Sequence, residues 1–96
     1  MITKKNFQEL ICYLGFVDTA KGIYEKQYSE LDACIRIDFN NEKIEYPEDR
    51  GMKITHHTTC NFSDPENFVV LECVDRLLSK GYRPEHLELE KEWTLG

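Results

Sequence analysis

Apolar residues recur at the spacing of one helix face near the start of the chain. At positions i, i+3, i+4 and i+7 stand Phe7, Leu10, Ile11 and Leu14. This period predicts an amphipathic helix from Thr3 to Leu14. Thr3 can cap the first turn through its hydroxyl, and Gly15 can adopt the left-handed conformation that closes a helix.

The middle of the chain alternates between apolar and polar residues, which is typical of a strand with one buried face. The clearest alternation runs from Ala33 to Phe39, and a shorter strand is predicted from Ile23 to Tyr28, after a loop that contains Gly22. Asn40-Asn41 tolerates the positive φ of a tight hairpin turn, and a partner strand follows from Lys43 to Tyr46. These segments predict an antiparallel meander of two or three strands.

A second helix is predicted from Pro65 to about Lys80, after an irregular stretch with a short strand at Met52 to Ile54. Ser63 or Asp64 can cap it, and Gly81 can close it. Its apolar stripe consists of Val70, Leu71, Val74, Leu77 and Leu78. The same spacing places Glu72, Asp75 and Ser79 on the polar face.

A last strand is predicted from Leu87 to Leu95, where leucines and Trp93 alternate with glutamates. The element order implies an α+β domain, and 96 residues suit one compact domain. Within it, residues 1–62 form a leader helix with the meander, and residues 63–96 form a helix and a strand.

Charge and cysteine usage narrow the class of protein. Eighteen acidic residues against 12 basic ones argue against strong binding of nucleic acid by this chain alone. No apolar run is long enough to span a bilayer, and the N-terminus lacks a signal peptide, so we expect a soluble, cytoplasmic protein. The four scattered cysteines are expected to be reduced and mostly buried.

Two groups of residues are candidate metal ligands. His56, His57 and Cys60 carry the ligand types that zinc prefers, but their spacing matches no closed zinc site, and a solvated loop with a small buried thiol is the simpler interpretation. Glu88, Glu90 and Glu92 would lie on one strand face, where charge protects an edge from aggregation. We therefore predict no metal site and no cofactor in this chain.

The stretch from Pro65 to Tyr82, followed by Leu87 to Trp93, resembles the start of the nuclease region in type I restriction enzyme R proteins. That family opens with a helix led by Pro-Glu, a Leu-Leu pair, a Gly-Tyr turn and a strand that carries Glu. Segments further upstream are similar to the leaders of bacterial restriction-modification polypeptides, namely Asn6-Phe7, Leu14 to Phe16 and Thr58 to Ser63. In some of those polypeptides a nuclease segment is fused to an adenine N6-methylase.

The resemblance implies a nuclease of the PD-D/E-x-K type in the full-length parent, with Mg²⁺ held by an Asp strand and a Glu-x-Lys strand that this chain lacks. The one candidate catalytic residue is Glu66, at the family's Pro-Glu position near the parent's metal site. The simpler interpretation of Glu66 is a helix N-terminal carboxylate stabilised by the helix dipole.

Three functions follow from these observations. The first is a non-catalytic scaffold in a DNA endonuclease, inactive alone, whose parent binds DNA and other restriction-modification subunits. The second is a subunit- or DNA-docking module at the N-terminus of a fused adenine N6-methyltransferase. The third is a free-standing interaction protein. Because the last strand would lack its natural neighbour, we also expect it either to add to the sheet of the meander or to pair with a second copy in a weak homodimer through a contact near Trp93.

Overall fold

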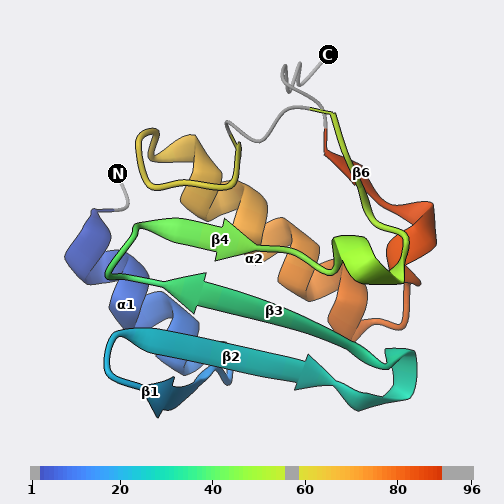
Figure 1. Ribbon diagram of the computed structural model, residues 1–96, viewed down its shortest axis with the longest axis horizontal. Helices are drawn as coiled ribbons and strands as arrows, with labels where there is room; N and C mark the ends of the chain where they lie inside the picture. The colour runs from blue at the N-terminus through green and yellow to red at the C-terminus, as the bar shows by residue number, and fades with distance from the viewer. Residues whose placement is uncertain (1–2, 56–58, 90–96) are drawn as a thin grey trace.

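The computed structural model describes residues 3–55 and 59–89 of the chain. It confirms an α+β fold, in which two helices pack against a four-stranded antiparallel meander (Figure 1). The elements are α1 (Lys4–Tyr13), β1 (Val17–Ala20), β2 (Ile23–Tyr28), β3 (Ala33–Asp38), β4 (Lys43–Glu45), β5 (Lys53–Ile54), α2 (Glu66–Ser79) and β6 (Glu88–Leu89). Short 3₁₀ turns in the described ranges lie at Ser29–Leu31, Glu48–Arg50 and Pro84–His86.

Helix α1 begins and ends as its sequence predicts. The Thr3 hydroxyl accepts a hydrogen bond from the backbone N–H of Asn6 at 3.2 Å. At the other end Gly15 has φ +101°, and the N–H of Phe16 donates to the carbonyl of Ile11 at 2.9 Å. This closing pattern satisfies carbonyls that the last helical turn leaves without partners.

Helix α2 uses the same two devices, within one residue of the predicted bounds. Asp64 Oδ1 accepts a hydrogen bond from the N–H of Glu66 at 2.9 Å, so the aspartate satisfies a free donor of the first turn. Gly81 has φ +96°, and the N–H of Tyr82 donates to the Leu77 carbonyl at 3.1 Å. The predicted start and stop signals are therefore confirmed.

The sheet has the strand order β1-β2-β3-β4. Its first strand corrects the prediction, because β1 lies in the segment that was expected to be a loop. All four residues of β1 are exposed, so no buried face marks the strand in the sequence. Its register with β2 is irregular between Asp18 and Ala20, which indicates a bulge.

The turn between β3 and β4 also differs from the prediction. Positive φ occurs at Glu42, at +53°, and not at Asn40 or Asn41. The Asp38 carboxylate accepts hydrogen bonds from the backbone N–H groups of both asparagines, at 2.8 and 3.0 Å, and from the Asn41 side chain at 2.8 Å. These hydrogen bonds lower the pKa of Asp38. They also hold the backbone of both asparagines at negative φ.

Strands β5 and β6 form a separate parallel pair, in which Lys53 lies opposite Glu88 and Ile54 opposite Leu89. The described part of the last strand therefore does not add to the sheet of the meander, because its neighbour is β5. The predicted alternation is confirmed for the described part, since Leu89 is buried and Glu88 is exposed. The rest of the predicted strand, residues 90–95, lies outside the described residues, as does the predicted dimer contact at Trp93.

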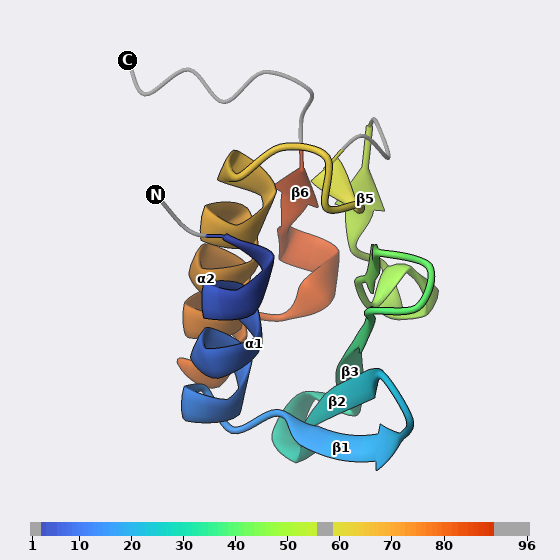
Figure 2. The same cartoon turned by 90° about the vertical axis from the view of Figure 1, so that its left-hand side faces the viewer.

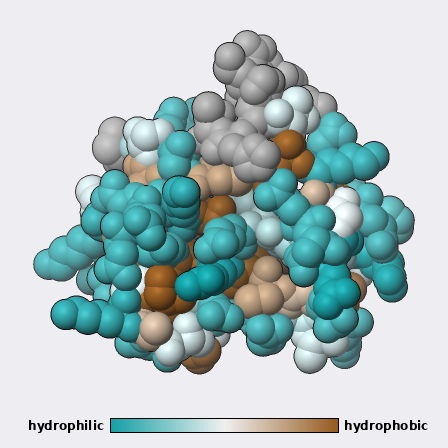
Figure 3. Space-filling view, in the orientation of Figure 1, coloured by the Kyte–Doolittle hydropathy of each residue, from teal (hydrophilic) through white to brown (hydrophobic). Residues whose placement is uncertain are grey.

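Both helices cover the same face of the sheet (Figure 2). Phe7 of α1 stacks on Phe68 of α2, with ring centroids 4.2 Å apart, and Phe62 packs edge-on against both rings. Ile35 and Ile37 of β3 are fully buried beneath the helices. The opposite face of the sheet, toward the viewer in Figure 3, is mainly hydrophilic, with smaller apolar patches.

The cysteines are free, as predicted, but they are not mostly buried. Cys12 and Cys73 are exposed, and Cys34 and Cys60 are half-buried. Cys12 and Cys73 lie on the sides of α1 and α2 that face solvent, so the core does not use their thiols. Among the described residues, no helix has the length and apolar character required to cross a membrane.

Two glycines in the left-handed region should respond differently to an added methyl group. A Cβ on Gly51 (φ +97°) would lie 3.0 Å from Glu85 Cβ, whereas a Cβ on Gly81 (φ +96°) meets no atom within 4 Å. Both alanine variants carry backbone strain, but only Gly51→Ala adds a steric clash, which lies between the 3₁₀ turns Glu48–Arg50 and Pro84–His86. We expect Gly51→Ala to lose about 1 kcal/mol more unfolding free energy than Gly81→Ala in urea titrations. Equal losses of unfolding free energy in the two variants would contradict the close approach of Gly51 to Glu85.

The hydroxyl of Tyr46 should contribute nothing to stability. Tyr46 is 5% exposed, and its hydroxyl has no hydrogen-bond partner among the described residues. Burial also raises the pKa of this hydroxyl well above its ordinary value. Because an unpaired buried hydroxyl costs free energy, Tyr46→Phe should leave the unfolding free energy unchanged or raise it by about 1 kcal/mol.

The control for this prediction is Tyr28→Phe. Tyr28 is equally well buried, but its hydroxyl donates to Asp75 at 2.6 Å, so this variant should be destabilised by about 1 kcal/mol or more. Thermal melts of both variants measure the two effects. An equal loss of stability in Tyr46→Phe would show that the Tyr46 hydroxyl has a partner.

Candidate binding groove between the two helices

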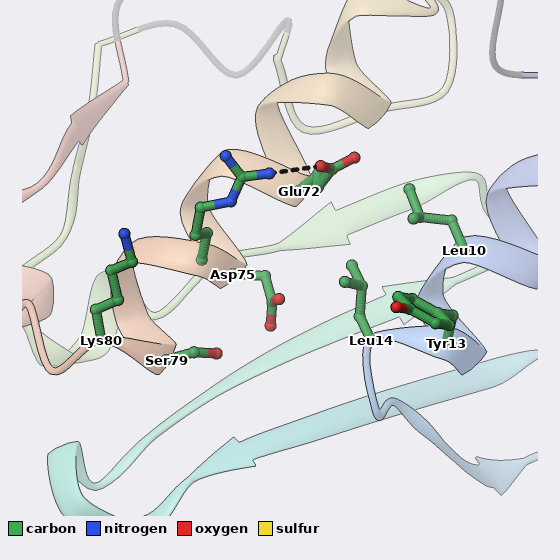
Figure 4. A pocket seen from close by; sticks show the side chains of 8 residues that line it. Leu10, Tyr13, Leu14, Glu72, Asp75, Ser79 and Lys80 are labelled. Atoms are coloured by element: carbon green, nitrogen blue, oxygen red, sulfur yellow. Dashed lines mark hydrogen bonds and ion pairs between the residues drawn. The ribbon is translucent and has the colours of Figure 1, made fainter.

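A groove of about 400 Å³ separates the C-terminal halves of α1 and α2 (Figure 4). It is lined by Leu10, Tyr13 and Leu14 of α1 and its C-cap, and by Glu72, Asp75, Arg76, Ser79 and Lys80 of α2 and its C-cap. One wall is therefore largely apolar and the other polar. Ligand sites in proteins combine apolar surface with placed polar groups, which makes this groove a candidate site.

The apolar wall consists of residues that the core uses only in part. Leu10 and Leu14 are half-buried and pack against the edge of the hydrophobic core. Tyr13 is 87% exposed, which is the highest value among the large hydrophobic residues that the structure describes. The ring of Tyr13 is thus available for contact with another molecule.

The polar wall carries an ion pair and a second cation. Arg76 donates to Glu72 at 2.9 Å, one helical turn earlier. Lys80 is exposed and forms no ion pair with a described residue. Its charge is therefore not neutralised within the described ranges.

Lys26 of β2 lies beneath the groove and joins the two helices to the sheet. Its ammonium group donates to Asp75 Oδ1 at 2.7 Å and to the backbone carbonyl of Leu14 at 2.6 Å, and it lies 3.4 Å from Ser79 Oγ. Asp75 is 5% exposed, so its carboxylate depends on this partner. The contact to Leu14 also satisfies a carbonyl at the end of α1.

Tyr28 completes the cluster beneath the groove. Its hydroxyl donates to Asp75 Oδ1 at 2.6 Å, and the Lys26 ammonium lies 5.3 Å from the centre of its ring. Burial, together with the hydrogen bond to the Asp75 carboxylate, raises the pKa of Tyr28 well above its ordinary value. The hydroxyl therefore stays protonated and remains a donor at neutral pH.

The electrostatics of the groove differ from those of the whole chain, which carries a net charge of −6. Glu72 and Asp75 are each paired with a cation, at 2.9 and 2.7 Å. Lys80 then leaves the groove with an excess positive charge. The Asp75 carboxylate and the Tyr28 hydroxyl are held by internal hydrogen bonds. The arrangement therefore suits binding rather than proton transfer.

The candidate catalytic residue Glu66 lies at the other end of α2. It is exposed in the first turn of the helix, away from the groove residues, and no side-chain partner is recorded for it within the described ranges. This position agrees with a carboxylate stabilised by the helix dipole. It leaves the Glu66 side chain accessible from solvent.

The residues considered as metal ligands are only partly described. His56 and His57 lie outside the described residues, as do Glu90 and Glu92. Cys60 is half-buried, and burial raises the pKa of its thiol. Within residues 3–55 and 59–89, no three His, Cys, Asp or Glu side chains form a group that could hold a metal ion.

Sequence reasoning missed the cluster beneath the groove. Asp75 was assigned to the polar face of α2, but it is buried, because it lies between Leu71 and Leu78 at the edge of the apolar stripe. Its spacing from these two leucines was the available signal. Nothing in the sequence pairs it with Lys26, which lies 49 residues away.

Comparisons with known protein families, with curated proteins and with solved structures found no match for this chain.

The Lys26–Asp75 pair should be a strong determinant of stability. Lys26→Met leaves the buried carboxylate without its cation, so we expect a loss of about 2–3 kcal/mol of unfolding free energy in urea. The double variant Lys26→Met with Asp75→Asn has no buried charge but keeps an acceptor for the Tyr28 hydroxyl. It should recover part of the lost unfolding free energy.

The matched control is Lys4→Met, which breaks the exposed Lys4–Glu42 pair of the same 2.7 Å length. Exposed pairs contribute little, so this variant should lose less than about 0.5 kcal/mol. Equal losses in the two lysine variants would rule out a structural role for the buried pair.

Proposed function

We propose that this chain is the N-terminal segment of a bacterial type I restriction enzyme R protein, or of a closely related restriction-modification polypeptide in the cytoplasm. Within that parent it acts as a non-catalytic scaffold for a nuclease that cleaves DNA. The chain on its own is not a nuclease.

The observation that carries the proposal is the continuity of the segment that resembles the family. Helix α2, the Gly81-Tyr82 turn and strand β6 follow one another directly, and both α2 and Leu89 of β6 contribute to the hydrophobic core. The exposed Glu66 lies at the start of this unit. The arrangement supports a segment that begins a nuclease core and presents one carboxylate.

Mg²⁺ fits this assignment as an ion of the parent. When bound in such a nuclease, Mg²⁺ activates water and stabilises the charge that develops on the phosphate. Glu66 would contribute one oxygen ligand, and the remaining carboxylates would come from strands that follow this segment. Within this chain, the Asp64 carboxylate fixes the backbone of Glu66 at the start of α2.

A second candidate function is a docking module for subunits or DNA at the N-terminus of a fused adenine N6-methyltransferase. The groove between α1 and α2 favours it, because the groove joins an exposed aromatic ring to Lys80, which has no ion pair among the described residues. The net charge of −6 makes a protein subunit a better partner than DNA.

The test begins with the natural reading frame. We expect it to continue beyond Gly96 with a strand that carries Asp and a strand that carries Glu-x-Lys. In the purified parent, Glu66→Gln should lower Mg²⁺-dependent cleavage of plasmid DNA at least tenfold, because a ligand oxygen is replaced by a weaker one. Glu9→Gln changes an exposed helix carboxylate on α1 and should leave cleavage unchanged.

Either of two results would overturn the proposal. One is a stop codon directly after Gly96. The other is a parent in which Glu66→Gln and Glu9→Gln cleave DNA equally well.

A further inference from the structure

We draw no further inference here: the strongest candidate, the groove between the C-terminal halves of α1 and α2, belongs to the site already described, and nothing in the described residues shows what covers it.

Discussion

Covering one face of a four-stranded sheet with two short helices is the constraint on which the rest of this structure depends. The covered face supplies Ile35 and Ile37, and the helices supply Phe7 and Phe68, whose rings stack at 4.2 Å. Because side chains of a strand alternate between faces, every second residue of β2 must also point toward the helices. The register that buries the β3 isoleucines therefore also turns Lys26 toward the helices, directly opposite Ile35.

A lysine beneath two helices requires partners, because an unpaired charge in the interior is costly. The structure supplies them from both helices, through Asp75 of α2 and the Leu14 carbonyl that ends α1. The hydrophobic effect alone would allow the helices to slide along the apolar face, since it has no direction. The geometry of three hydrogen-bonding groups does not allow this, so the polar cluster fixes where the groove lies.

Local periodicity predicted the elements that have one buried and one exposed face, namely both helices, β2, β3, β4 and the described part of β6. It failed for β1, whose four residues are all exposed, so there is no alternation to detect. It failed at the β3–β4 turn because the Asp38 side chain determines the backbone there. The groove and the Lys26–Asp75 pair were beyond prediction, since both arise from contacts between segments that are distant in the sequence.

The two ends of α2 serve different purposes. The first turn is capped by Asp64 and presents Glu66 to solvent, whereas the last turns line the groove and contact the sheet through Asp75. The rigid hydrogen-bonded backbone of the helix places these two surfaces at a constant separation, about 1.5 Å of rise for each residue between them. The groove end of α2 and its Glu66 end therefore keep a defined position relative to each other. In the parent that we propose, this one helix would carry both the groove and a carboxylate of the nuclease core.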